Sequence, residues 1–460
     1  MVLGRVGYNK WPWVVVVVMI LLVFSSFRNS SKDVEFNVLE SVTAEQQISL
    51  NQLYYESLRL KVDSFMKRSN KKYRFNGTVL LASNGNVLFE GAYGYQNLLS
   101  KDTLSPNVSF QLASVSKQFT AVAALMLVQR DQLQLADTVQ KIIPDFPYKR
   151  ITVEMLLQHT SGLPNYMWML EHHWSDTVIP HNDDLIALMA RLNLPLYFTP
   201  GRRHDYSNTG YVVLASIIEK IAGKSYKHFI EEEIFQALNM KNSSVFVHSG
   251  SAPDSLRTRG YLKKWRGWRV YNATVHDGLV GDKGVYSSVH DLFLWDQALY
   301  NGSLLSKELL NTAFTKGKIR NRWEFAYGYG FRIKQMNKKK VVYHHGRWEG
   351  FRNSFVRMID DELTVIALSN SDCRSINTIS YKLERMLSAS LHQPEIELVN
   401  TAINYGLEFG LEKFGLMLED NAKLKVDSEK LELSAVYLES IKKYQLANIV
   451  RQLKLKIGQV

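Results

Sequence analysis

The chain has 460 residues, of which 46% are hydrophobic and 22% are charged, a composition that excludes a disordered chain and supplies a large core with one appendage. Its 56 Lys and Arg outnumber its 44 Asp and Glu, and the net charge of +12 favours anionic partners such as phospholipid headgroups or wall polymers. The basic residues form short scattered clusters without a basic helix or an aromatic RNA-binding motif, which argues against nucleic acid as a partner.

The first predicted element is an apolar run over residues 11–24, preceded by Arg5 and Lys10. A run of about 14 residues is typical of the core of a signal peptide, and three more residues bring it near the ~17-residue minimum for spanning a bilayer. We therefore expect residues 1–28 to be a signal peptide or membrane anchor, and the lack of an Ala-x-Ala cleavage site favours the anchor. Positive charge ahead of the run predicts that the rest of the chain lies outside the cytoplasm, which is the periplasm if the cell is Gram-negative.

A polar linker over residues 29–49 and an amphipathic helix from Leu50 to Phe65 are expected next, because apolar residues then recur at helical spacing. Two strands, over residues 78–82 and 87–93, follow this helix. The turn-rich break between them predicts a β-hairpin.

The middle of the main domain, residues 113–240, is predicted to be mostly helical, with segments at 121–128, 153–157, 184–192 and 211–221. Short β-rich runs return at residues 341–345, 354–358 and 363–368, before a last helix from Ile376 to Leu387. Strands at both ends of residues 50–392 around a helical middle predict an α+β fold, in which helices flank an antiparallel sheet and a helical lobe is inserted. We expect the active site in the groove between sheet and lobe.

Residues 393–460 are predicted to form a helical extension, with one apolar stripe over residues 403–414 and a pair of helices over residues 427–453. They resemble helix-turn-helix repeat units, but fewer than three repeats do not make an independent solenoid. We expect the extension to pack on the main domain or on a second chain, where it would mediate self-association.

The first chemical motif is Ser114-Val115-Ser116-Lys117, at the start of a predicted helix. Ser114 and Lys117 are three residues apart and so lie on one face, where a lysine whose pKa is depressed can take the proton of a serine hydroxyl. The helix N-terminus also directs backbone N–H groups toward a developing oxyanion. Taken alone, this pattern arises often by chance.

The second motif is Tyr206-Ser207-Asn208, after a Pro-Gly turn and before a predicted helix. A tyrosine beside a lysine exchanges protons with it, and an asparagine offers both a donor and an acceptor to a substrate amide. By itself, this motif indicates only a tyrosine in a loop.

The third motif, His344-His345-Gly346-Arg347, ends a predicted strand. The glycine allows a substrate backbone to lie close alongside, and the N–H that follows completes an oxyanion hole. Alone, two adjacent histidines are more often a feature of an edge strand or surface than catalytic.

In this order and at these distances, the three motifs resemble the Ser-x-x-Lys, Tyr-x-Asn and Lys/His-x-Gly boxes of the β-lactamase-related serine hydrolases. This family includes class C β-lactamases, DD-peptidases, D-aminopeptidases and family VIII esterases. The resemblance covers roughly residues 50–390, with further similar blocks at residues 75–94, 156–164, 199–211, 281–295 and 343–351.

The resemblance implies that Ser114 attacks a carbonyl to form an acyl-enzyme, while Lys117 and Tyr206 move the proton to the leaving group. The backbone N–H groups of Ser114 and Arg347 would hold the oxyanion, and Asn208 would orient the substrate amide. Which of Lys117 and Tyr206 is the principal base stays open, because a coupled pair titrates as a unit.

His344, Gly346 and Arg347 are expected to bind substrate. His344 stands where β-lactamases commonly carry lysine. We expect the pKa of this histidine to be lowered, and its change of charge should make turnover depend on pH between about 5.5 and 7.5. This departure favours peptide, amide or ester substrates, small or derived from the cell wall, over β-lactams. The alternatives are a β-lactamase or DD-carboxypeptidase proper, or a catalytically silent penicillin-binding-like regulatory protein.

No cofactor or metal is expected. Cys373 is the only cysteine, which excludes an intramolecular disulfide and a Cys-ligated zinc site, and no His-x-x-x-His pattern or carboxylate cluster accompanies the three motifs.

Overall fold

The computed structural model describes residues 44–175, 177–248, 257–320, 322–391, 428–440 and 444–457. The chain divides into one compact unit, Arg59–Ser388, and a second made of Met1–Leu58 and Ala389–Val460; each is described by itself. The predicted anchor over residues 1–28 lies outside the described residues. Within the described ranges, no helix combines the length and the apolar character that a membrane crossing requires.

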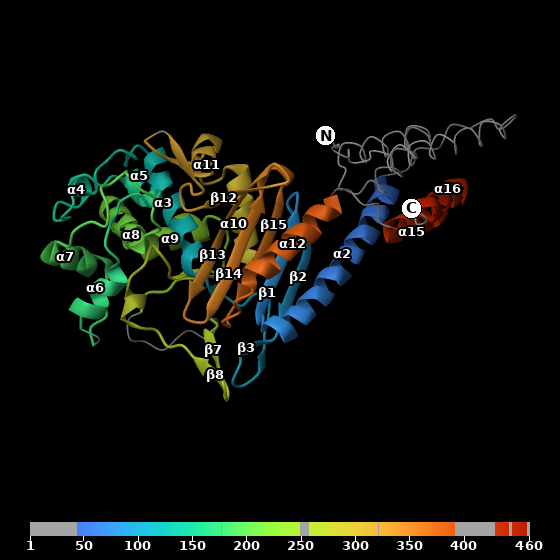
Figure 1. The fold of residues 1–460 in the computed structure, drawn as a ribbon, viewed down its shortest axis with the longest axis horizontal. Helices are drawn as coiled ribbons and strands as arrows, with labels where there is room; N and C mark the ends of the chain where they lie inside the picture. The colour runs from blue at the N-terminus through green and yellow to red at the C-terminus, as the bar shows by residue number, and fades with distance from the viewer. Residues whose placement is uncertain are drawn as a thin grey trace, which may run out of the picture. The chain divides into compact units, whose positions relative to one another are not determined.

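The larger unit is built on a six-stranded antiparallel sheet in the order β12-β13-β14-β15-β1-β2 (Figure 1). The predicted hairpin forms β1 (Gly77–Ser83) and β2 (Asn86–Tyr93), and β1 pairs along its whole length with β15 (Leu363–Ser369). The other strands are β12 (Arg332–Met336), β13 (Lys339–Trp348) and β14 (Phe351–Met358). The prediction of an antiparallel sheet assembled from both ends of the domain is therefore confirmed.

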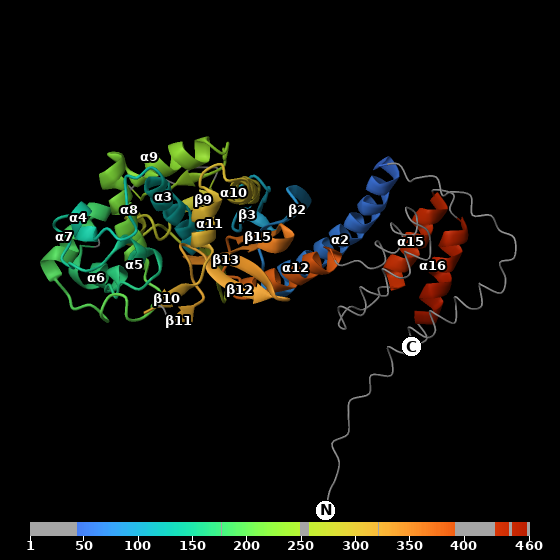
Figure 2. The same ribbon diagram turned by 90° about the horizontal axis from the view of Figure 1, so that it is seen from above.

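Helices cover both faces of this sheet. Helix α12 (Ile376–Leu391) lies on one face and α10 (Val289–Asn301) on the other (Figure 2), so every residue of β1 and β15 is buried. A buried ion pair joins α10 to β14, with Arg357 Nε 2.5 Å from Asp296 Oδ1. Helix α2 (Ala44–Tyr73) begins inside the segment that the sequence predicts as linker.

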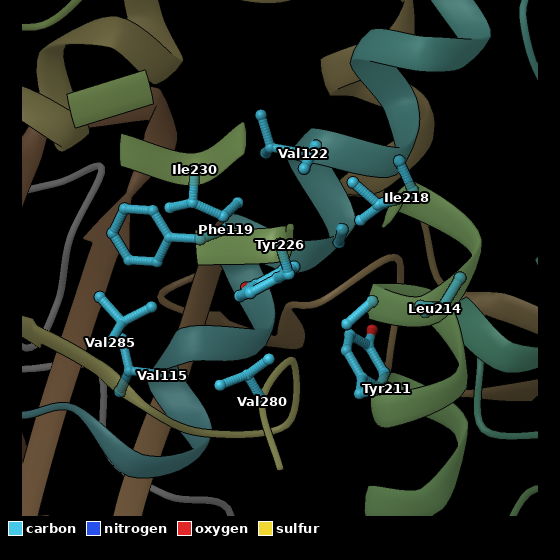
Figure 3. Close-up of a cluster of buried hydrophobic side chains, with 14 of the residues drawn as sticks. Val115, Phe119, Val122, Tyr211, Leu214, Ile218, Tyr226, Ile230, Val280 and Val285 are labelled. Carbon is cyan, nitrogen blue, oxygen red and sulfur yellow. The ribbon is translucent and has the colours of Figure 1, made fainter. Parts of the chain in front are cut away.

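The inserted lobe is helical, as predicted. Its core is formed by α3 and α8, whose residues are buried on nearly all sides, which is typical of helices inside a large protein. Phe119 and Val122 of α3 and Leu214 and Ile218 of α8 belong to one buried hydrophobic cluster (Figure 3). The helices of the lobe are α3 (Lys117–Gln129), α4 (Val139–Ile142), α5 (Val153–Leu157), α6 (Tyr166–His173), α7 (Asn182–Leu192), α8 (Asn208–Ala222) and α9 (Tyr226–Ile230).

Several short elements connect the sheet and the lobe, and the sequence predicts none of them because two to four residues carry no readable periodicity. They are β3 (Tyr95–Asn97), β4 (Asp102–Thr103), β5 (Phe110–Gln111), β6 (Ser244–Val245), β7 (Tyr261–Lys264), β8 (Gly267–Val270), β9 (Val285–Ser287), β10 (Gly317–Ile319), β11 (Trp323–Phe325) and the seven-residue α11 (Lys307–Ala313). Strands β5, β9 and β6 form a small sheet beside the turn that carries Ser114.

In the second unit, the described residues of the C-terminal extension form two helices, α15 (Ser428–Ser440) and α16 (Tyr444–Ile457), which contact each other. Apolar residues of both are buried, and Arg451 of α16 pairs with Glu432 and Glu439 of α15. The helical character predicted for this part of the extension is confirmed, whereas the stripe predicted over residues 403–414 lies outside the described residues.

Candidate active site

Ser114 lies in η1 (Ala113–Ser116), a single 3₁₀ turn that leads directly into α3. Ala113, before it, has φ of +53°, a left-handed conformation that non-glycine residues adopt rarely. Strand β13 passes very close to this turn, because a Cβ at Gly346 would lie only 2.1 Å from the carbonyl oxygen of Leu112. Glycine in the third motif therefore allows the strand to reach the nucleophile.

Lys117 brings the first two motifs together. Its side chain is fully buried, and its Nζ donates to Ser114 Oγ at 3.3 Å, to Asn208 Oδ1 at 2.8 Å and to the carbonyl oxygen of Asp282 at 2.8 Å. The Tyr206 ring lies beside it, with its centroid 5.1 Å from Nζ. This is the arrangement in which a lysine exchanges a proton with a serine hydroxyl.

Tyr206 presents a hydroxyl that is buried yet has no hydrogen-bond partner among the described residues. The loop that carries it is held by His159, whose Nδ1 accepts the N–H of Ser207 at 3.1 Å and whose ring lies 4.3 Å from the Tyr206 ring. Ser207 caps α8 by accepting the N–H of Gly210. An unpaired buried hydroxyl beside the base is a group left free to bond to a reacting substrate.

His344 is 1% exposed, and both of its ring nitrogens bond to the protein. Nδ1 donates to the carbonyl oxygen of His345 at 2.8 Å, so Nε2, 3.1 Å from the Tyr327 hydroxyl, is the acceptor of a neutral ring. Burial, followed by the positive charges of Lys117 and Arg332, holds the pKa of His344 well below its ordinary value. Burial also lowers the pKa of His345 to about 4.

The expected direction of the His344 shift is thus confirmed, but the expected pH range is not. The pKa of His344 lies well below 6.5, so its titration moves toward lower pH than that of an ordinary histidine. His344 lines the cleft, yet it is 1% exposed and bonded to Tyr327.

Sheet and lobe enclose a cleft of about 960 Å³, lined by Ser114, Tyr206, His344, Gly346 and Arg347. Pairing between β12 and β13 ends at Arg332 and Tyr343, so among the described residues the edge of β13 beyond that point has no strand beside it. An unpaired strand edge offers backbone N–H and C=O groups to an extended ligand. Two further predicted site residues lie behind this lining: Lys117 contacts both Ser114 and Asn208.

Sequence reasoning missed a buried network behind Lys117. Asp282 accepts a hydrogen bond from the Tyr166 hydroxyl at 3.1 Å, while Lys283 Nζ lies 2.9 Å from the same hydroxyl and 3.6 Å from Asp282 Oδ1. Both charged residues are at most 2% exposed, and the segment between Gly281 and Gly284 directs the Asp282 carbonyl to Lys117. The available signal was an adjacent Asp-Lys pair between two glycines, both of which have positive φ.

A model of the family described as Beta-lactamase matches residues 62–375. Penicillin-binding protein 4* of Bacillus subtilis is 35% identical over 339 residues, which cover 69% of this chain and 73% of that protein. A D-aminopeptidase of Brucella anthropi is 25% identical over 356 residues, covering 74% of this chain and 64% of the relative.

Solved structures of proteins with a similar fold support the same relationship. The octameric penicillin-binding protein homologue from Pyrococcus abyssi is similar with a TM-score of 0.62 and 28% identity, covering 71% of this chain and 77% of that one. The D-amino acid amidase of Ochrobactrum anthropi, at 21% identity, is similar in fold, with a TM-score of 0.61 and coverage of 73% and 99%.

Proposed function

Because the chain belongs to the Beta-lactamase family of serine acyl-enzyme hydrolases, we propose that it hydrolyses peptide or amide bonds through Ser114. The observation that carries this proposal is the buried amino group of Lys117, whose Nζ lies 3.3 Å from Ser114 Oγ and donates to Asn208 Oδ1 at 2.8 Å. The similarity to a D-aminopeptidase supports an amide substrate with a D-configured residue. The unpaired edge of β13 supports a substrate with an extended backbone.

In the first step, Ser114 Oγ attacks the substrate carbonyl while its proton passes to Lys117 and Tyr206, which act as a coupled pair. The N–H groups of Ser114 and Arg347 stabilise the oxyanion. The C–N bond then breaks, and the proton passes through the Tyr206 hydroxyl to the leaving amine. This hydroxyl is suited to the task because no hydrogen-bond partner for it is found in the described part of the chain.

In the second step, water attacks the acyl ester and gives one proton back to Ser114 through the same pair, releasing the acid. Asn208 orients the substrate amide with the side-chain atoms that Lys117 leaves unbound. His344 is neutral and bonded to Tyr327, so fixed positive charge for a substrate carboxylate comes from arginines of the cleft.

We also propose that the enzyme acts at the cell envelope, outside the cytoplasm. The apolar run over residues 11–24, with Arg5 and Lys10 ahead of it, supports this location.

A fluorophosphonate probe tests the nucleophile. We expect covalent labelling of the full chain, and complete loss of label in Ser114→Ala with an unchanged melting temperature. Ser116→Ala is the matched control, since this neighbouring serine is buried and its Oγ only accepts the N–H of Val285. Equal labelling of wild type and Ser114→Ala would remove Ser114 from the mechanism.

A substrate panel then separates the family's activities. D-amino acid p-nitroanilides, p-nitrophenyl esters and a chromogenic cephalosporin are assayed with wild type and Ser114→Ala. Turnover of the anilides is expected to exceed that of the cephalosporin. Faster cephalosporin turnover would assign the chain as a β-lactamase, and labelling without turnover of any substrate would support a regulatory protein.

A further inference from the structure

The cleft beside Ser114 carries more positive charge than one substrate carboxylate requires. Its lining includes four arginines and a single acidic residue, Asp372. The arginines are Arg332, Arg347, Arg352 and Arg374. Asp372 also accepts the backbone N–H of Lys263 at 3.3 Å, so its charge is partly engaged elsewhere.

Three of these side chains form what we call the basic cluster: Arg347, Arg352 and Arg374. Arg347 and Arg352 are direct cross-strand partners on β13 and β14, a placement in which like charges destabilise a sheet. The pKa of Arg352 is lowered, first by burial and then by the charge of Arg347, while the charge of Asp372 opposes this shift and outweighs the smaller effect of Arg374. The fold thus holds like charges together at a cost in free energy.

Among the described residues, no carboxylate oxygen forms an ion pair within 4.0 Å of a guanidinium nitrogen of the basic cluster. Arg352 donates only to the carbonyl oxygen of Phe351, and the side chains of Arg347 and Arg374 are exposed. Guanidinium groups in this state are suited to binding a carboxylate or phosphate in a bidentate manner.

The fourth arginine lies at a different position along the cleft. Arg332 is paired with Tyr343 and stacks on the catalytic Tyr206, with its guanidinium carbon 5.2 Å from the ring centroid. Arg347 is four residues beyond Tyr343 on the same strand, about 13 Å away at the rise of an extended chain. An extended peptide along this edge would present side chains about four residues apart to the two ends.

We propose that the basic cluster is a second anion subsite, and that the substrate is an acidic peptide which extends along the free edge of β13. One carboxylate binds near Arg332, and another, about four residues away, binds the basic cluster. This inference rests on the proposed function, since it specifies the substrate of the same site. The net charge of +12 assists the encounter with such a peptide at low salt.

Binding to full-length Ser114→Ala tests the subsite without turnover. Three dye-labelled peptides of equal length are compared by fluorescence anisotropy: one with two glutamates four residues apart, one with the glutamates adjacent, and one with glutamines. The spaced glutamate peptide is expected to bind about tenfold more tightly than the glutamine peptide, as one charged hydrogen-bonded contact allows, and the difference should shrink at high salt.

Arg352→Gln/Arg374→Gln, added to Ser114→Ala, should reduce that tenfold ratio to about threefold or less. Arg150→Gln is the control, because it removes one positive charge from an exposed position outside the cleft and should leave the ratio unchanged. Equal binding of the glutamate and glutamine peptides would overturn the proposal, as would equal binding of the spaced and adjacent glutamates or an equal loss in Arg150→Gln.

Two further outcomes would show which proposal has failed, the acidic-peptide subsite or the hydrolysis of such peptides. If poly(glycerol phosphate) displaces the peptide at a tenfold lower concentration than the spaced glutamate peptide itself, the subsite recognises a phosphate polymer and the acidic-peptide proposal is wrong. If the spaced glutamate peptide binds selectively but wild type does not hydrolyse it, the subsite stands and the proposed hydrolysis of such peptides fails.

Discussion

At the scale of single residues, buried histidines surround the catalytic centre as neutral groups. His159 is fully buried and accepts the N–H of Ser207, while His344 is bonded between Tyr327 and the backbone. Burial and then the charge of Lys117 hold the pKa of both well below the ordinary value. These rings position the Tyr206 loop and β13, and their protonation would oppose folding.

The stability of the protein should therefore depend on pH below about 6.5, the pKa of histidine in an unfolded chain. The folded pKa of His344 is lower, so the unfolded chain takes up a proton first as the pH falls. The contribution of the neutral ring is complete above 6.5 and declines toward the folded pKa, by up to ~1.4 kcal/mol per pH unit for each such histidine. Urea unfolding measures the free energy of unfolding between about pH 7.5 and 4.5. As the pH falls, this free energy should decline less steeply for His344→Gln than for wild type.

His290→Gln serves as the control for this measurement, because His290 is exposed. Its decline with pH should match that of wild type. If His344→Gln also matches wild type, the ring is protonated in the folded protein and our description of its bonding is incorrect.

At the scale of elements, the active site is a contact between a turn and a strand. In the proposed mechanism, turn η1 carries the nucleophile Ser114, and β13 carries the oxyanion donor and the edge along which a substrate would lie. The contact is close only because Gly346 has no Cβ to meet the Leu112 carbonyl. A small displacement of either element therefore changes the distance between reacting groups.

Gly346→Ala should lower kcat/KM by about a hundredfold or more, since a shift of about 1 Å has that effect on positioned groups. The new Cβ would lie 2.1 Å from the Leu112 carbonyl oxygen, so one element must move. Gly210→Ala in α8 is the matched control, with its nearest neighbour 3.5 Å from the added Cβ, and should keep its activity. Steady-state kinetics on the best anilide, with fluorophosphonate labelling rates, measure the effect; unchanged kinetics in Gly346→Ala would mean that the contact is not needed.

At the scale of the whole molecule, the catalytic unit Arg59–Ser388 is followed by a helical extension and preceded by an apolar N-terminal run. The paired helices α15 and α16 bury apolar residues against each other, with ion pairs along one side. The proposed site lies entirely in the catalytic unit.

We expect the full chain to fractionate with membranes and a chain lacking residues 1–28 to be soluble with unchanged kcat/KM. The physical reason is that the apolar run over residues 11–24, with the three residues after it, comes near the minimum length of a membrane segment, whereas every proposed site residue lies beyond it. Fractionation followed by anilide assays measures both. Recovery of the intact full chain in the cytosol would contradict the envelope location.

The sequence by itself determined the α+β class, the order of the main strands and helices, and the three motifs with Ser114, Lys117 and Tyr206. These features are readable because periodicity of apolar residues reports local structure, and because each motif is a short run of the chain. The confirmed helices α7 and α8 of the lobe are long enough to be recognised in this way.

Only the tertiary structure decided what depends on contacts between distant residues. The hydrogen bond from Tyr166 to Asp282 behind Lys117 is one example, and the bond between His344 and Tyr327 is another, because each joins separate segments. The basic cluster likewise arises when β13, β14 and the loop before α12 meet, although Arg347 and Arg374 are far apart in the sequence. Burial and charge at a site are properties of its neighbours in space, and a linear pattern does not list them.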